Sequence, residues 1–202
     1  EIPLRLVGSE MCIRDRLYGA HNTSKRIAEQ LEWGESIKKR VWQRVVRDKI
    51  REQARFLKER DYEREARQLS QIVPEVRSGD TTNREAQAAR LYFAALFGPD
   101  FSRESDIPTN VALNYGYAVL LSLVNREITA RGCITQVGIC HRNEYNQFNL
   151  TCDLMEPFRP AVDRLVVDYL AADFDADMRR VLGDLANTHV AYKDCLLYTS
   201  PS

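Results

Sequence analysis

The stretch NVALNYGYAVLLSLVNREITARG, residues 110–132, decides the fold class of this chain. The stretch is long and nearly all apolar, and Gly132 marks its end. A helix that is hydrophobic all round is typical of the buried interior of a protein. We therefore expect these residues to form the buried central helix of an all-α bundle.

Other segments also show helical patterns. Over residues 36–60, apolar side chains recur at the spacing of a helix face. This stripe consists of Ile37, Val41, Trp42, Val45, Val46, Ile50, Ala54 and Leu57. Apolar spacing, together with Gly, Pro and capping residues, predicts further helices over residues 62–72, 83–97, 161–174 and 176–191. The short connections between these segments predict an all-α helical bundle.

The composition limits the class of protein. The 202 residues include 29 basic and 29 acidic side chains, so any nucleic-acid-binding surface must be local. No run approaches the roughly 18 apolar residues that a membrane span needs. Apart from the chain ends, the cysteines are Cys133, Cys140 and Cys152. Their odd number and irregular spacing argue against a disulfide framework and predict a reducing, cytoplasmic environment.

The two ends of the chain have an unusual relationship. Residues 11–15 can be encoded by a nucleotide stretch whose reverse complement, extended and read in another frame, encodes residues 195–200. Two unrelated protein ends should not be inverted copies of one nucleotide sequence. We therefore expect residues 1–16 and 195–202 to be adapter-derived, non-native ends that are exposed or irregular. The helical domain is then expected to span residues 17–194.

Polar residues gather in the stretch GICHRNEYNQFNLTCDLMEPFRP, residues 138–160. It contains His141, Asp153 and Glu156, and the two acids at i and i+3 face one side if the turn is helical. A further acid, Glu85, lies on the inward face of its helix, where a carboxylate is costly unless a cation compensates it. Together these residues are candidate ligands of a divalent metal.

Each candidate also has an ordinary structural interpretation. Glu85 fits a capping box with Thr82, and Asp153 and Glu156 fit the N-cap and N3 positions of a helix. A lone histidine such as His141 is more often a hydrogen-bonded polar residue than a metal ligand.

A zinc site is a second alternative for part of the stretch. Cys133, Cys140, His141 and Cys152 supply four possible ligands, but structural zinc sites usually use close pairs two to four residues apart. Small core residues are the simpler interpretation of these cysteines.

The helix over residues 37–60 is strongly basic, with ten cations against three acids. Most such helices simply have a solvated face, but this one offers a local patch that can neutralise phosphates. The candidate nucleic-acid-binding residues are Lys38, Lys39, Arg40, Arg44, Arg47 and Arg51.

Several long motifs resemble one protein family. REAQAARLYFAALFG, NVALNYGYAVLLSLVNREITARG and the stretch at residues 138–160 occur in order, and SIKKRVWQRVVRDKI and EVRSGDTTN accompany them. They resemble the CRISPR-associated integrase of the spacer-acquisition complex, in its type II branch, over about residues 17–167. The resemblance implies a helical catalytic domain that binds a divalent metal through Glu85, His141 and Glu156, with Asp153 in a supporting role. Cys140 departs from the family pattern, which often has a histidine there.

The resemblance also implies an activity and partners. The expected reaction is the metal-dependent insertion of DNA segments into a CRISPR array, in which a 3′-hydroxyl attacks a phosphodiester at the border of a repeat. Mg²⁺ or Mn²⁺ suits the carboxylate and imidazole ligands. The implied partners are prespacer and repeat DNA, a small ferredoxin-like adaptation protein, a second copy of the chain and, in type II systems, the effector nuclease. Family members begin with a β-rich domain that builds the homodimer, so the chain is expected to be a fragment that lacks this domain. The alternative is a non-catalytic helical DNA-binding or scaffold protein.

Overall fold

The computed structural model describes residues 23–169, 176–187, 190–192 and 195–197. The prediction of an all-α helical bundle is confirmed, with one short hairpin in addition. The α-helices are α2 (Thr23–Leu31), α3 (Glu35–Glu59), α4 (Glu63–Glu75), α5 (Arg84–Phe97), α6 (Pro108–Ala130), α7 (Asn149–Met155), α8 (Arg159–Tyr169) and α9 (Ala176–Gly183). Short 3₁₀ turns are η2 (Ser78–Asp80), η3 (Glu156–Phe158) and η4 (Leu185–Asn187), and the strands are β1 (Val190–Tyr192) and β2 (Cys195–Leu197).

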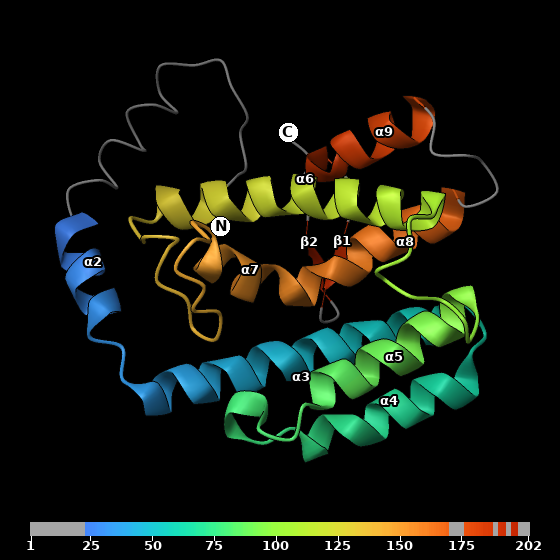
Figure 1. The fold of residues 1–202 in the computed structure, drawn as a ribbon, viewed down its shortest axis with the longest axis horizontal. Helices are drawn as coiled ribbons and strands as arrows, with labels where there is room; N and C mark the ends of the chain where they lie inside the picture. Colours follow the sequence, from blue (N-terminus) through green and yellow to red (C-terminus); the bar gives the residue numbers. More distant parts are fainter. Residues whose placement is uncertain (1–22, 170–175, 188–189, 193–194, 198–202) are drawn as a thin grey trace.

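The helices form two layers. Helices α3, α4 and α5 lie side by side in one layer, and α6, α7, α8 and α9 lie in the other (Figure 1). Helix α3 contacts both layers, because it packs on α4 and α5 and also on η3, α7 and α8. One apolar cluster lies around Phe56 and Leu69 and extends to Ile128 of α6 and Leu150 of α7, and a second lies around Leu113 and Val162. No described helix is long and apolar enough to cross a membrane.

Helix α6 contains the stretch that was expected to be buried on all sides, and it is buried on one face only. Leu113 and Leu120 are in the core, whereas Val111 and Tyr115 are exposed. Helices α8 and α9 pack against α6, and the part of its surface that they leave uncovered faces solvent (Figure 1). At Gly116 it comes so close to α8 that a Cβ atom would overlap the side chain of Val162. High apolar content therefore overestimated the burial of this helix.

Helix α2 was not predicted, and the other differences lie near the ends of helices or in the short segment of α7. The helix predicted over residues 176–191 ends at Gly183, and β1 follows η4. Residues 149–158 form α7 and η3 where a turn was expected. On α3, the predicted apolar stripe is buried from Trp42 onward, but Ile37 and Val41 are exposed.

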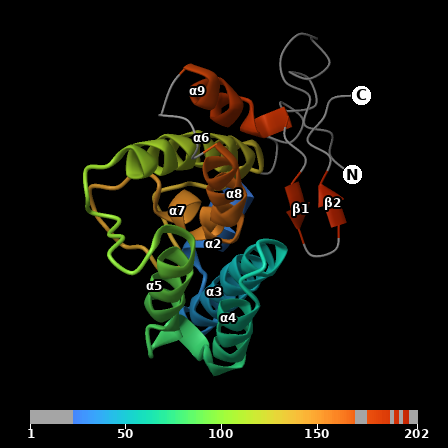
Figure 2. The same cartoon turned by 90° about the vertical axis from the view of Figure 1, so that its right-hand side faces the viewer.

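The hairpin bears on the expectation for the chain ends. Strand β2 pairs antiparallel with β1, so residues 195–197 are not irregular. Both strands lie beside the helical layers and not within them (Figure 2). The first predicted non-native end, residues 1–16, lies outside the described residues.

A buried aspartate joins the two layers. Asp163 of α8 accepts hydrogen bonds from the hydroxyls of Tyr117 on α6, at 2.5 Å, and Tyr92 on α5, at 3.0 Å. Burial raises the pKa of Asp163 to about 6, although the two tyrosine hydroxyls act in the opposite direction. One carboxyl group thus connects three helices, and its ionisation is coupled to folding.

This coupling predicts a pH dependence of stability. Because the pKa of Asp163 is higher in the folded chain than its ordinary value, the folded state gains stability at low pH and loses it as pH rises through about 6. Between pH 4 and pH 7 this contribution to the free energy of unfolding should fall by up to about 3 kcal/mol. Chemical denaturation of Asp163→Asn should show a correspondingly flatter pH profile. The exposed Asp100→Asn variant is the control and should keep the profile of the parent chain; an identical profile for both variants would contradict the assignment.

Candidate metal and nucleic-acid site

Lys49 lies between the two predicted glutamate ligands. Its Nζ atom on α3 is 2.6 Å from Oε1 of Glu85, in the first turn of α5. The same atom is 2.5 Å from Oε2 of Glu156, the first residue of η3. The structure therefore brings two of the predicted site residues together, around a lysine that the sequence analysis counted only among the cations of the basic helix.

The position of Glu85 depends on the turn before α5. The carboxylate of Asp80 accepts hydrogen bonds from the backbone N–H groups of Arg84, at 2.9 Å, and Glu85, at 3.0 Å. Asp80 therefore caps α5, and the predicted capping box between Thr82 and Glu85 is wrong. Because another residue satisfies the helix N-terminus, the Glu85 carboxylate is available to Lys49.

Asp153 holds the loop that carries His141. Its carboxylate is fully buried in α7 and accepts hydrogen bonds from the backbone N–H groups of Ile139, Cys140 and His141, at 2.5, 2.9 and 3.2 Å. Its Oδ1 atom also lies 2.5 Å from Nδ1 of the His141 ring. Asp153 is therefore inside a helix and binds another loop, so the alternative that it is an N-cap is wrong.

The contact with Asp153 determines how His141 can act. The hydrogen bond that Asp153 accepts from the ring raises the pKa of the imidazole, despite the opposing effect of partial burial. The negative charges of Asp153, Glu156 and Glu85 raise this pKa further. Since Nδ1 is engaged, Nε2 is the ring nitrogen left to bind a ligand. The His141 ring packs edge-on against Trp42, with the ring centroids 5.9 Å apart, which further fixes its orientation.

Gly138 permits this loop to close on Asp153. A Cβ atom at this position would overlap the carbonyl oxygen of His141 and would lie 2.9 Å from Oδ2 of Asp153. No residue with a side chain fits there without moving the loop. The glycine is the one sequence signal from which this close approach could have been predicted.

Arg159 binds the other side of Glu156. Its Nη2 atom lies 2.9 Å from Oε1 of Glu156, and its guanidinium stacks 4.6 Å from the centre of the Tyr117 ring. Each oxygen of Glu156 thus faces a different cation. Two cations therefore flank this buried carboxylate, and Glu85 balances the second positive charge.

The donor types fit a divalent metal, and a cation already occupies the space between the carboxylates. Among the described residues, no three His, Cys, Asp or Glu side chains are arranged to hold a metal ion as they stand. Burial disfavours the charge of Lys49, but attraction to Glu156 and Glu85 outweighs this and raises its pKa, so the ammonium is charged. Two carboxylates and an imidazole nitrogen are ligands that suit Mg²⁺ or Mn²⁺.

The cysteines show no sign of thiolate chemistry. Cys133, Cys140 and Cys152 are free thiols. Burial, together with the charges of Asp153 and Glu85, raises the pKa of Cys140 to about 11, so this side chain stays protonated at neutral pH. It borders the site without resembling a zinc ligand.

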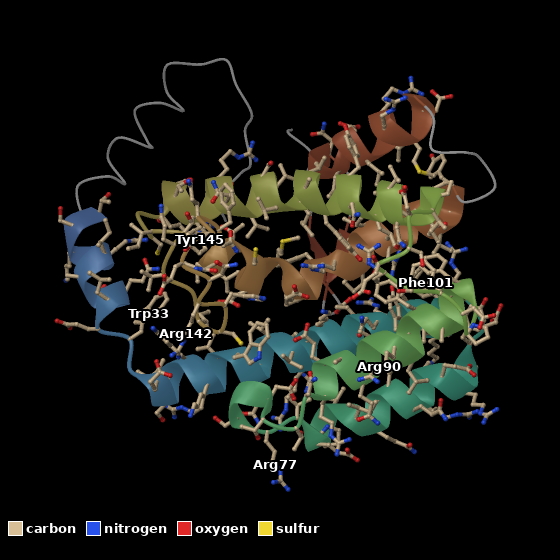
Figure 3. The ribbon with its side chains drawn as sticks, in the orientation of Figure 1. Trp33, Arg77, Arg90, Phe101, Arg142 and Tyr145 are labelled. Carbon is tan, nitrogen blue, oxygen red and sulfur yellow. The ribbon has the colours of Figure 1, made fainter. Side chains whose placement is uncertain are left out.

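A hollow of about 330 Å³ adjoins His141. Its lining includes Lys38 of α3 and Arg142, whose guanidinium lies 2.5 Å from the carboxylate of Glu35. Figure 3 shows Arg142 near the N-terminal turns of α3, with Tyr145 on the same loop. Tyr145 is almost fully exposed, at 93%. The hollow is polar and open to solvent, so its surface is suited to binding a charged polymer.

The predicted nucleic-acid-binding cations divide into two groups. Arg44 and Arg51 both form ion pairs with the buried Asp48, at 3.0 and 2.8 Å. Arg47 donates to the carbonyl oxygen of Val76 at 3.0 Å. The other three are Lys38, Lys39 and Arg40, and they form no ion pair with another described residue. These three lie at the end of α3 that borders the hollow, so they are the better placed to contact phosphates.

One relative is similar over most of the chain. It is the CRISPR-associated endonuclease Cas1 of Neisseria meningitidis, which is 47% identical over 147 residues. The match covers 73% of this chain and 48% of the relative. The chain therefore spans about half the length of this curated relative.

Solved structures share the fold. A chain of a partial Cas6-RT-Cas1–Cas2 complex has a TM-score of 0.70 and 23% identity, over 84% of this chain and 63% of that one. A casposase bound to integration product has a TM-score of 0.61 and 18% identity, over 91% and 64%. The sequence profile of the family described as CRISPR associated protein Cas1 matches residues 1–178. The chain belongs to the CRISPR associated protein Cas1 family.

Proposed function

We propose that this chain carries the catalytic part of a metal-dependent DNA integrase and endonuclease that inserts new spacers into a CRISPR array. The observation that carries the proposal is the meeting of Glu85 and Glu156, from separate elements, on one buried cation. The charges of both glutamates also act on the imidazole of His141, which Asp153 holds. Two carboxylates so close together, one of them buried, repel each other unless a positive charge lies between them. The Neisseria relative is named as an endonuclease, which supports the same activity. The type II branch is part of the proposal and rests on the resemblance of the sequence motifs.

Each side chain has a distinct role in this proposal. Glu85 and Glu156 would supply carboxylate oxygens to the metal, and His141 would supply Nε2. Asp153 acts through His141, since its hydrogen bond to Nδ1 fixes the tautomer and the ring orientation. Mg²⁺ or Mn²⁺, when bound, would polarise a phosphoryl oxygen and lower the pKa of the attacking hydroxyl.

The reaction is an exchange of phosphodiester bonds. The 3′-hydroxyl of the captured DNA loses its proton and forms a new bond to a phosphorus at the border of a repeat. The bond from that phosphorus to the 3′-oxygen of the repeat strand breaks, and this oxygen takes up a proton. No external energy source is needed, because one phosphodiester replaces another. With water as the nucleophile, the same site would cut DNA.

The proposed partners follow from the family and from the basic surface. The solved structures with this fold include Cas1–Cas2 complexes and a casposase bound to integration product. For this chain we propose prespacer and repeat DNA, a small ferredoxin-like adaptation protein, and a second copy of the whole protein. The type II effector nuclease is a further proposed partner in segment selection.

The first test removes one predicted ligand at a time. In a protein extended to the full length of the Neisseria relative, Glu85→Gln, Glu156→Gln and His141→Ala should each reduce strand transfer by at least about 100-fold. Circular dichroism and DNA binding should change little. Glu63→Ala, an exposed acid on α4, is the control and should retain activity. Normal strand transfer by the three variants would refute the proposed site.

The second test concerns the pair formed by His141 and Asp153. In Asp153→Asn the negative charge that raises the pKa of His141 is lost, and the neutral amide oxygen is a weaker acceptor for the imidazole, so this pKa should fall toward its ordinary value. The pair stabilises the folded chain most at low pH, and that stabilisation is lost as pH rises through the folded-state pKa of His141. An NMR titration of the imidazole in chelator measures the shift, and an unchanged titration curve would show that Asp153 does not control the ring.

The third test concerns the cations at the start of α3. If Lys39 and Arg40 each contact a phosphate, replacing either with alanine should reduce the log–log salt slope of duplex affinity by about 1. Arg44→Ala should have a smaller effect, since that side chain is paired with Asp48. Arg64→Ala, on the exposed face of α4, is the control. Equal slopes for all of these variants would remove the start of α3 from the DNA surface.

A further inference from the structure

Lys49 occupies the position between the two carboxylates that the proposed metal would need. We propose that Lys49 is an internal counter-cation that holds Glu85 and Glu156 together until a divalent ion displaces its ammonium group. This inference rests on the proposed function, because it concerns the same site. It assigns to Lys49 a positioning role that is separate from metal ligation and from DNA binding.

The contacts of Lys49 show why the carboxylates depend on it. Its ammonium is within 2.6 Å of Glu85 and 2.5 Å of Glu156, so the two contacted oxygens can be no farther apart than these distances combined. Glu156 is nearly fully buried, and Lys49 is little more exposed. Two carboxylates at this separation repel each other when no cation lies between them. The ammonium removes this conflict in the metal-free chain.

The backbone of Lys49 is fixed, but its side chain can move. Its neighbour Ile50 is fully buried in the core, and its other neighbour, Asp48, is paired with Arg44 and Arg51. Helix α3 therefore cannot shift easily to make room for a metal. The lysine side chain has several rotatable bonds, so its ammonium group can move away from the carboxylates while the backbone stays in place.

Arg159 differs from Lys49 in this respect. It holds the other oxygen of Glu156 at 2.9 Å, and its guanidinium is also stacked on Tyr117. A planar group with two kinds of contact is less free to leave than an ammonium. We therefore expect Arg159 to stay in place while Lys49 is displaced.

Displacement has a measurable consequence for metal affinity. A ligand that binds only one of two states has its apparent affinity reduced by the fraction of molecules in that state. Suppose that molecules with the Lys49 ammonium between the carboxylates outnumber molecules in the open state by tenfold or more. Removing the ammonium should then lower the dissociation constant of the metal by at least about tenfold. A lysine that only supports the fold would not have this effect.

The experiment compares Mn²⁺ binding to this chain and to Lys49→Met, followed by the EPR signal of free Mn²⁺. Methionine keeps the length of the side chain and removes the charge. We expect the dissociation constant to fall by at least about tenfold in Lys49→Met. Lys49→Arg keeps the cation and should bind Mn²⁺ no more tightly than the parent chain. Lys58→Met, exposed on the same helix, controls for the general loss of one positive charge.

Thermal unfolding gives a second readout of the same variants. In chelator, Lys49→Met should unfold at a lower temperature than the parent chain, because the carboxylates have lost their cation. Saturating Mn²⁺ should raise its unfolding temperature more than that of the parent chain.

A measurement on the unaltered chain does not depend on the folding of any variant. The ¹⁵N signal of the Lys49 ammonium should shift when diamagnetic Mg²⁺ is added, because the group leaves its two carboxylates. An unchanged signal at saturating Mg²⁺ would overturn the displacement.

The outcomes separate this inference from the proposed function. Tighter Mn²⁺ binding in Lys49→Met alone supports displacement. Equal or weaker binding in Lys49→Met, with clear binding by the parent chain, overturns the inference and leaves the metal site intact. No Mn²⁺ binding by the parent chain or by any variant overturns both.

Discussion

The buried ammonium of Lys49 is the contact on which the arrangement of the site depends. It joins α3, which spans the first layer, to the start of α5 and to the 3₁₀ turn after α7. A charged group away from water is tolerated only when it is paired and hydrogen-bonded, so these three elements must meet at this point if all three charges are to be satisfied. The position of the proposed catalytic carboxylates is therefore fixed by electrostatics as well as by apolar packing.

This ionic cluster continues into the core through Arg159. The guanidinium contacts Glu156 and stacks on Tyr117, and the hydroxyl of Tyr117 donates to Asp163. Tyr92 donates to the same carboxylate from α5. A continuous set of polar contacts thus runs from the site to the junction of the two layers, where a partly satisfied network would be costly. Helices therefore support the site on both sides and hold the proposed metal ligands in place.

The helices were predictable where the apolar pattern was long, and the site only in part. Periodicity located α3 and α5, because burial of one face leaves a trace every three to four residues, and a long apolar run located α6. Periodicity missed α2 and α7, which have nine and seven residues and are too short for a periodic pattern to stand out. Sequence spacing also could not show that Lys49 is buried, since it stands in a run of solvent-facing cations whose pattern carries no information about Glu85, 36 positions away. The contact depends on how α5 crosses α3, which is a property of packing.

The stretch at residues 138–160 shows why His141, Asp153 and Glu156 are so close in sequence. Asp153 uses both oxygens to bind three backbone N–H groups and the imidazole of the loop before it, so the acid and the histidine must be connected by a chain short enough to fold back. Gly138 removes the side chain that would block this return. One turn later along the same helical segment, Glu156 points to Lys49. The two acids therefore have different tasks: Asp153 orients a nitrogen ligand from the buried side, and Glu156 presents an oxygen to the cation. Their spacing of three residues places both on one side of a short helix, which is how a single segment can serve the imidazole and the carboxylate cluster together.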